Sequence, residues 1–421
     1  MRCWIPLYVR TLTLSVNILT QLIKSGRVKS TTRLNRWWYM STLFTINTCK
    51  TYGCRNLGIP VSADYSWPDY RLGFPALHCR ACGSYPPLYD EQQFNEWLSV
   101  HLSAYASEYG YFCPECYCKE TICYGHNPQR TQRVQCRVCK KVWTPKKQKQ
   151  KQKQRNIALP ERIETVSLIV PFQGGSAKQK LYVLLSFDAV CGNVIHISTN
   201  FTQHYIGETL RYHWRGDSEP DLHHSDIINR VDMRETQFLR RSQFDEIQYG
   251  SAILKRNARG AILRPVIAAH GHFRVLNLLF PEVKMHVISH ECFLRGAVIT
   301  VWAERFRQQQ GELWFIEEEI NDSEINAPWS FLGTTQHGWW QNQWQLWGQG
   351  KNRKMVCPLT GGDSSTAKML SLTASRHFIN WLYKQADFTH SHKLSAWSVT
   401  QTLLSLAHDY NGKLTIASSD D

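Results

Sequence analysis

Residues 79–83 read Cys-Arg-Ala-Cys-Gly, and this short stretch decides how the first third of the chain folds. Two cysteines separated by two residues and followed by a glycine are typical of a tight turn that presents two thiolates to one metal ion. An earlier pair, Cys49 and Cys54, is separated by four residues and supplies two more sulfurs. Because tetrahedral zinc takes four ligands, we expect these four cysteines to bind one structural zinc ion.

The same pattern of cysteines occurs a second time further along the chain. The sequence therefore predicts two zinc sites, with ligands Cys49, Cys54, Cys79 and Cys82 in the first and Cys113, Cys118, Cys136 and Cys139 in the second. In the second site Cys116 is an alternative to Cys118, and Cys123 lies nearby. Such small ribbons cannot build an adequate core, so roughly 10–16 kcal/mol of binding free energy per zinc would be mostly folding energy. Each site is then either part of a partner-binding head or purely structural.

Disulfide bonds are the other common use for so many cysteines. The chain has fourteen, and ten of them lie between Cys49 and Cys139, mostly in close pairs. We favour metal binding, because no secretory signal peptide precedes them and disulfides belong to oxidising compartments.

Charge and length narrow the classes of partner. The chain has 421 residues, a formal net charge of +15 and 43% hydrophobic residues, which is enough for a buried core and excludes global disorder. Such a basic balance indicates a polyanionic partner, nucleic acid first and an acidic membrane surface second. Residues 4–23 are the most apolar stretch, but Arg10 and several polar residues interrupt it, so we expect no membrane span.

A basic stripe carries much of the positive charge. Eleven Lys or Arg residues lie from Arg130 to Arg155, and no Asp or Glu occurs between Thr121 and Pro160. Cations of this kind neutralise phosphates and release counterions, so we expect the stripe to bind DNA with a strong salt dependence. The expected contacts are Arg130, Arg133, Arg137, Lys140, Lys141, Lys146 and Lys147. The alternative is a solvated tail that aids solubility.

Composition divides the chain into four regions. Residues 1–39 are a basic leader, either an upstream extension before a start near Met40 or a membrane-surface or targeting arm. Residues 40–144 hold the two zinc ribbons, and residues 145–160 form a Lys/Gln linker that cannot bury surface. Residues 161–421 alternate between strands and helices, which predicts a mixed α/β domain with a helical C-terminal part.

The elements expected in this last region follow from hydrophobic periodicity. We expect strands over residues 165–170, 180–186, 194–198, 284–289 and 313–317, with helices over residues 273–280, 293–307, 365–385 and 398–410. The last hundred residues are expected to be helical. The tryptophan-rich segment from Trp339 to Trp347 is interpreted as core rather than as a stacking platform for bases.

Two groups of motifs resemble bacterial insertion-sequence transposases. Residues 77–88 (LHCRACGSYPPL), Cys113-Pro and residues 132–144 (QRVQCRVCKKVWT) are similar to the zinc-ribbon head of those proteins, with Trp143 where phenylalanine is usual. Residues 183–195 (VLLSFDAVCGNVI) look like the first acidic strand of their catalytic domain. The stretch from AAHGHF at residues 268–273 to LRGA at residues 294–297 is similar to the part that carries their second acid. The resemblance covers roughly residues 41–320.

This resemblance implies an RNase H-like domain in which acids hold two Mg²⁺ ions for DNA strand cleavage and transfer. Asp188 matches the first acid, although an aspartate before a Gly-Asn turn is also a common turn former. The second position departs from the family, since His290 and Glu291 stand where an aspartate is expected. Glu291 is then a ligand or a helix cap. No third acid can be placed, and the run Glu317–Glu319 is expected at a solvated edge.

The sequence thus predicts a transposase-like protein that cleaves and joins DNA, containing two structural Zn²⁺ ions and catalytic Mg²⁺. It would act in the cytoplasm at the bacterial nucleoid, with homo-oligomers on DNA ends as a further expectation. The alternative is a zinc-ribbon DNA-binding protein that has lost catalysis. His270 and His272 flank a glycine and are interpreted as core or turn residues rather than metal ligands.

Overall fold

The computed structural model describes most of the chain from residue 45 to residue 417. The described ranges are 45–71, 74–89, 91–92, 94–98, 101–102, 121–137, 139–144, 159–173, 180–202, 226–240, 252–253, 261–321, 327–338 and 342–417. Contacts divide the chain into two compact units. The larger unit comprises residues 45–105 and 148–421, and the smaller one has its described residues at 121–137 and 139–144. The first cysteine cluster therefore belongs with the α/β region, which differs from the predicted grouping of both clusters in one region.

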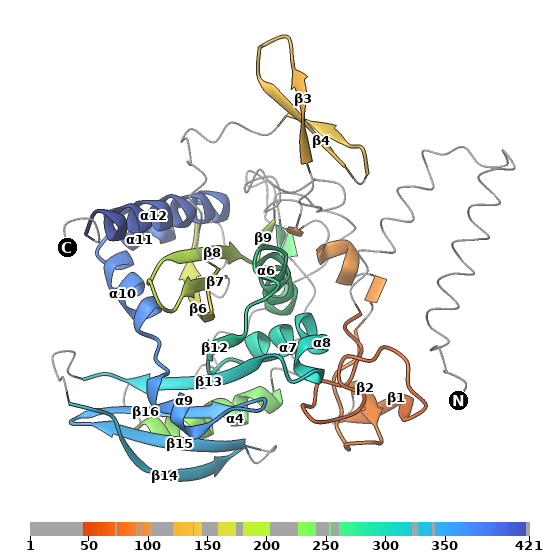
Figure 1. Cartoon of the computed structure of the whole chain (residues 1–421), viewed down its shortest axis with the longest axis vertical. Helices are drawn as coiled ribbons and strands as arrows, with labels where there is room; N and C mark the ends of the chain where they lie inside the picture. Colours follow the sequence, from red (N-terminus) through yellow and green to blue (C-terminus); the bar gives the residue numbers. More distant parts are fainter. Residues whose placement is uncertain are drawn as a thin grey trace, which may run out of the picture. The chain divides into compact units, whose positions relative to one another are not determined.

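An eight-stranded mixed sheet organises the larger unit (Figure 1). Its strands are β6 (Arg162–Pro171), β7 (Lys180–Asp188), β8 (Val194–Thr199), β12 (Met285–Ser289), β13 (Glu312–Glu319), β14 (Ser330–His337), β15 (Asn342–Gln349) and β16 (Asn352–Pro358). They lie in the order β14-β15-β16-β13-β12-β6-β7-β8. Strand β12 runs parallel to both β6 and β13, whereas β6, β7 and β8 form consecutive antiparallel pairs.

Helices cover both faces of this sheet. They are α4 (Ile227–Arg240), α6 (Pro265–Leu279), α7 (Cys292–Val301), α8 (Ala303–Arg307), α9 (Ser364–Met369), α10 (Thr373–Leu382), α11 (Ala386–Thr389) and α12 (Ala396–Ala417), with a 3₁₀ turn η4 (Ser391–Lys393). Strand β7 is buried along its length after Lys180, as expected for a strand covered on both sides. The ring of Phe187 packs 5.5 Å from that of Phe378 in α10, whereas Ser186 hydrogen-bonds His272 in α6. Neighbouring residues of a strand face opposite ways, so α6 and α10 lie on opposite faces.

Most predicted elements of the α/β region are confirmed, with one exception. Residues 330–358 form the three antiparallel strands β14, β15 and β16, so the prediction that the last hundred residues are helical is wrong there. The helical prediction holds from α9 onward. Trp344 and Trp347 are buried on β15, in agreement with their interpretation as core, while residues 339–341 lie outside the described residues.

Three smaller sheets complete the described structure. In the larger unit β1 (Tyr65–Arg71) pairs with β2 (Phe74–Cys79), and the short strands β9 (Phe201–Thr202), β10 (Ala252–Ile253) and β11 (Ala261–Ile262) pair in the order β10-β11-β9. In the smaller unit β3 (Thr121–His126), β4 (Gln132–Cys136) and β5 (Val142–Trp143) form an antiparallel sheet in that order. In the described part of the chain, no helix combines the length and apolar character that crossing a membrane needs.

Candidate metal centre

Four cysteine side chains of the larger unit converge on one point. We call Cys49, Cys54, Cys79 and Cys82 the cysteine tetrad; their sulfur atoms all lie within 4.8 Å of one another. Cys49 Sγ lies 3.5 Å from Cys82 Sγ, and Cys54 Sγ lies 3.8 Å from Cys79 Sγ. Sulfurs around tetrahedral zinc lie about 3.8 Å apart, because each Zn–S bond is about 2.3 Å long. The first predicted ligand set is therefore brought together at a spacing that suits a zinc ion.

A tight turn presents two of these sulfurs. We call residues 79–84 the first knuckle. The amide of Cys79 donates to the carbonyl of Ser84 at 2.9 Å, and the amide of Gly83 donates back to the carbonyl of Cys79 at 2.8 Å. Gly83 has a φ of 70°, which a glycine adopts without the steric cost of a Cβ. The sequence expectation of a turn glycine after Cys82 is confirmed.

Polar groups and burial around the tetrad shift the pKa values of its thiols. Ser84 Oγ lies 3.1 Å from Cys82 Sγ, and Asn56 Nδ2 donates to Cys79 Sγ at 3.5 Å. Burial raises the pKa of the Cys49 thiol. Burial acts in the same direction on Cys82, but hydrogen bonds from Ser84 and a neighbouring threonine outweigh it and lower the pKa of Cys82 to about 7. Because a metal ion displaces thiol protons, its affinity for the tetrad must decrease as the pH falls.

The donor set suits a structural zinc ion and does not suit magnesium. Four thiolates are soft ligands that fill all the positions of tetrahedral zinc, whereas Mg²⁺ takes oxygen ligands. With every position occupied by protein, the ion would supply folding free energy and leave no open position for a substrate. None of the four tetrad cysteines is in a disulfide bond.

We call residues 45–98 the tetrad module, which packs directly against the α/β part of the larger unit. Arg307 Nη1, at the end of α8, donates to the carbonyl of Leu57 at 3.3 Å. Gly58 approaches Ala303 so closely that an added Cβ would collide with the Cβ of that alanine. On α6, the ring of His270 meets that of Phe94 edge-on at 5.3 Å. The tetrad therefore lies within the packed body of the larger unit.

Half of the second predicted zinc site lies within the described residues. We call residues 136–141 the second knuckle, which contains Cys136 and Cys139. The amide of Cys136 donates to the carbonyl of Lys141 at 2.9 Å, and the amide of Lys140 donates to the carbonyl of Cys136 at 3.1 Å. This repeats the bonding of the first knuckle, with Lys140 at φ 62° in the place of Gly83. Cys113, Cys116 and Cys118 lie outside the described residues, so a second zinc ion stays a prediction.

Asp188 is found at the end of β7, where the sequence predicted it. Its Oδ1 accepts from the amide of Val190 at 2.8 Å and from that of Cys191 at 3.3 Å. These are the bonds of a turn-forming aspartate. Glu291 is the N-cap of α7, and its carboxylate accepts from the amide of Phe293 at 3.4 Å. Both carboxylates are buried and both bind local backbone.

The strand register does not bring Asp188 and Glu291 together. Asp188 pairs with Ile163 of β6, which in turn pairs with His286 near the start of β12. Glu291 follows the end of β12, beyond three further strand residues that span about 10 Å. Carboxylates that share two metal ions only about 4 Å apart must lie much closer. Among the described residues, the tetrad is the one group of three or more ligating side chains close enough to hold a metal.

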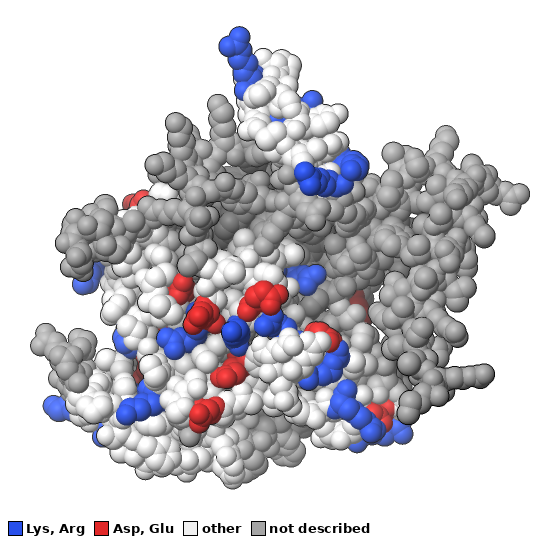
Figure 2. Space-filling model, viewed as in Figure 1, with Lys and Arg blue, Asp and Glu red and all other residues white. Residues whose placement is uncertain are grey.

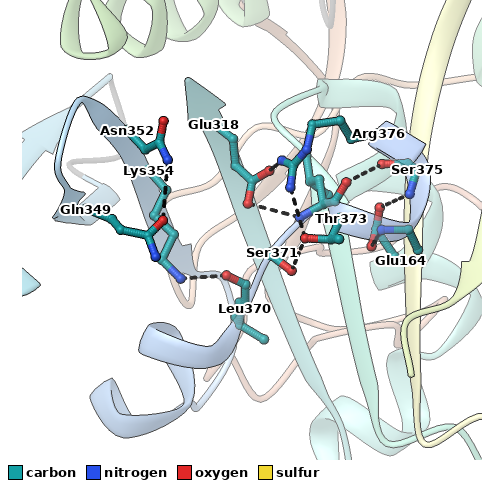
Figure 3. A network of polar contacts seen from close by, with 12 residues as sticks. Glu164, Glu318, Gln349, Asn352, Lys354, Leu370, Ser371, Thr373, Ser375 and Arg376 are labelled. Carbon is teal, nitrogen blue, oxygen red and sulfur yellow. Dashed lines mark hydrogen bonds and ion pairs between the residues drawn. The ribbon is translucent and has the colours of Figure 1, made fainter. Parts of the chain in front are cut away.

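Buried charges that the sequence analysis did not single out fasten α9 and α10 to the sheet (Figure 3). Glu164 of β6 accepts from the amide of Ser375 at 2.7 Å and from that of Ala374 at 3.3 Å, at the start of α10. Burial raises the pKa of Glu164 to about 7. Lys354 of β16 donates to the carbonyls of Lys368 and Leu370, both at 2.6 Å. Desolvation lowers the pKa of Lys354 to about 8.

The run Glu317–Glu319 is not a solvated edge, so that expectation is wrong. Glu318 faces α10 and pairs with Arg376 at 2.5 Å. Glu317 faces the other way and lies 3.6 Å from Arg230 and from Arg234, both on α4. Glu319 also pairs with Arg230, at 3.3 Å. Alternation along β13 therefore distributes the three acids between helices on its two faces.

The two histidines of the AAHGHF stretch are core residues, as interpreted from sequence. His272 Nε2 lies 2.8 Å from Ser186 Oγ, and its Nδ1 lies 2.8 Å from Ser198 Oγ. His270 Nδ1 lies 2.7 Å from the carbonyl of Val266, one helical turn earlier. Burial lowers the pKa of His270 to about 3, and it also lowers that of His272. Both rings are therefore neutral at physiological pH.

The predicted DNA-contacting residues that are described all lie in the smaller unit. They are Arg130, Arg133, Arg137, Lys140 and Lys141, whereas Lys146 and Lys147 lie outside the described residues. Their side chains are exposed or half-buried. On the face shown in Figure 2, the described part of this unit carries Lys and Arg side chains and no Asp or Glu.

In a comparison with known proteins, the chain matches no protein-family model, no curated protein and no solved structure.

Proposed function

We propose that this protein binds DNA through the basic sheet β3–β5 and that a structural zinc ion at the cysteine tetrad stabilises its larger unit. One observation carries the proposal: the smaller unit has five Lys or Arg residues among its described residues, and no Asp or Glu occurs from Thr121 to Pro160. A surface of one sign gains free energy by releasing counterions from a phosphate backbone.

Fixed turns support this surface as a contact site rather than a solvated tail. Arg130 closes the turn between β3 and β4, where its amide donates to the carbonyl of Asn127 at 2.8 Å. Asn127 Oδ1 in turn accepts from the amide of Thr131 at 2.7 Å. Lys140 occupies the corresponding turn of the second knuckle. Cations held on ordered turns lose less conformational entropy on binding than cations in a flexible segment.

The sheet of the larger unit supports a relation to insertion-sequence transposases at the level of fold. Strands β6, β7 and β8 form two hairpins, after which β12 and β13 are each reached through helices. Strand β12 runs parallel to β6 and β13, and β13 is antiparallel to β16. A mixed sheet of this kind is what the resemblance implies for an RNase H-like domain. Such support concerns fold, and chemistry has to be argued from the site.

Metal-dependent strand cleavage and transfer is the second candidate function, favoured by the same sheet. The placement of the acids weighs against it. Asp188 and Glu291 each lie at the C-terminal end of a strand, but β7 and β12 run in opposite directions, so the two acids lie toward opposite edges of the sheet. Each also binds local backbone. We therefore prefer a transposase-like DNA-binding protein that has lost catalysis at this pair of residues.

Binding to duplex DNA tests the first proposal. Titrating a labelled duplex with the full chain at about 50 mM and about 200 mM salt should show the affinity falling by about 100-fold or more, as expected for five or more phosphate contacts. The double variant Arg133→Gln/Arg137→Gln should bind more weakly and show a shallower salt slope. An affinity that barely depends on salt would contradict the basic surface as the contact.

A cleavage assay separates the two candidate functions. With Mg²⁺ or Mn²⁺ and candidate terminal-repeat DNA, we expect no cleavage from the wild-type chain and none from Asp188→Asn. Cleavage by the wild type that disappears in Asp188→Asn would restore the catalytic interpretation of that residue.

A further inference from the structure

The smaller unit exposes an aromatic ring beside a cation on the same sheet. Tyr124 of β3 is 46% exposed. The guanidinium carbon of Arg133, on the neighbouring strand β4, lies 5.7 Å from the centroid of the Tyr124 ring. This is within the range of a cation–π contact, which orients both groups. Tyrosine and arginine therefore form one composite surface.

An apolar residue extends this surface along the strand. Ile122 is 36% exposed and lies two residues before Tyr124, so both side chains face the same side of β3. Ile122 pairs across the sheet with Gln135, and a register shift follows between Cys123 and His126. Cys136 is the one residue of this unit with a described side chain that is fully buried. The ring of Tyr124 thus remains accessible instead of contributing to a core.

We propose that Tyr124 and Arg133 bind an unpaired base of single-stranded DNA, Tyr124 by stacking on it and Arg133 by contacting its phosphate. The proposal rests on the DNA-binding function proposed above and specifies the form of DNA that this surface prefers. Bases in a duplex stack on one another and hide their faces, whereas single strands offer them to exposed aromatic residues.

Charge complementarity supports the same occupant. Arg130 lies at one end of β4, in the β3–β4 turn, and Lys140 and Lys141 lie at the other end, in the second knuckle. A backbone that follows β4 would pass cations before and after the stacked base. This combination of a basic track with an aromatic residue is the usual way in which proteins bind single strands without reading sequence.

The test compares single-stranded and duplex DNA on the full chain. A labelled oligothymidine of about 16 nucleotides and a duplex of the same length are titrated with wild type, Tyr124→Ala and Tyr124→Phe. We expect Tyr124→Ala to weaken binding to the single strand by about tenfold or more, with less than about a twofold change on the duplex. Tyr124→Phe should bind like wild type, because stacking needs only the ring.

Tyr383→Ala is the matched control, since Tyr383 is 56% exposed in the larger unit and should not affect either DNA. Equal binding of single strands by Tyr124→Ala and wild type would overturn the inference, and so would equal losses on both DNA forms. If the wild type bound neither DNA, the proposed function itself would fail. Photocrosslinking of the wild type to an oligonucleotide with 5-bromodeoxyuridine needs no variant. It should label Tyr124, and labelling confined to the larger unit would refute the proposal.

Discussion

The two knuckles share a backbone conformation and differ in their surroundings. Each has an amide of its first cysteine bonded to the carbonyl five residues later and a left-handed residue after its second cysteine. The first knuckle meets Cys49 and Cys54 and lies in the unit that contains the large sheet. In the smaller unit, described burial is confined to Cys136. A cysteine turn therefore forms from local sequence, whereas its importance for stability depends on what packs around it.

Replacing one cysteine in each knuckle should give the largest difference in stability between two variants. If the tetrad binds zinc as proposed, Cys79→Ser should lose that ion and unfold the larger unit, because a structural zinc ion would contribute on the order of 10 kcal/mol to folding. Cys136→Ser should leave the larger unit folded and weaken DNA binding. Thermal unfolding and elemental zinc analysis report both effects. If Cys79→Ser and Cys136→Ser had the same unfolding temperature, the tetrad would not be needed for the stability of the larger unit.

A methyl group added to two left-handed glycines tests the packing of the tetrad module. Gly58→Ala should destabilise the larger unit by about 4 kcal/mol, since the new Cβ meets Ala303 and the residue also has a φ of 67°. Gly83→Ala has a similar φ and nothing within 4 Å of the added Cβ, so it should cost about 1 kcal/mol. Urea unfolding measures both. Equal losses would mean that the module does not press against α8.

The buried carboxylate of Glu164 should make the stability of the larger unit depend on pH. Its pKa is about 7 in the folded protein, against 4.5 for an unperturbed glutamate, so the folded state holds this proton more tightly. The unfolding free energy of wild type relative to Glu164→Gln should therefore fall by about 3 kcal/mol as the pH rises from 4.5 to 7. Measurements on the exposed Glu161→Gln should show no such trend. Glu164→Gln should not change the affinity of the protein for DNA.

The smallest effect concerns the left-handed position of the second knuckle. Lys140→Gly should stabilise this turn by about 1 kcal/mol, because glycine adopts a φ of 62° without the cost of a Cβ. If Cys136 and Cys139 belong to a second zinc site, as predicted, competition with a zinc chelator should then show about fivefold tighter zinc binding at that site. The control Lys141→Gly also removes one positive charge, at the neighbouring position, and should not increase the zinc affinity. A weaker site in Lys140→Gly would show that the knuckle bond pattern does not follow that of the first.

Sequence predicted the features that depend on neighbouring residues. The tetrad and its turn follow from cysteine spacing and a glycine, and β6, β7 and β8 follow from runs of apolar and β-branched residues. The strands over residues 330–358 could not be predicted, because apolar residues in this segment are sparse and many of its polar residues are uncharged, which leaves little hydrophobic periodicity. Its strands form because Trp344 and Trp347 become buried in the assembled sheet.

Contacts between distant residues could not be predicted from the sequence. Glu164 binds Ser375, which is 211 residues away, and no local pattern distinguishes Glu164 from a surface acid. For the candidate catalytic acids, the sequence correctly predicted Asp188 at the end of a strand and Glu291 next to the start of a helix. Their separation follows only from the order and direction of β7, β6 and β12.

The three glutamates of β13 have a consequence for insertions and deletions. Glu317 and Glu318 pair with arginines of different helices, α4 and α10, because neighbouring residues of a strand face opposite sides. One extra residue ahead of them would turn every side chain of the strand to the opposite face. Glu317 would then take the place of Glu318 beside α10, and Glu318 that of Glu319 beside α4, whereas Ile316 would replace Glu317 beside Arg230 and Arg234. The run of three acids therefore keeps an acid facing α10 after a one-residue insertion, and α4 loses one of its two partner acids.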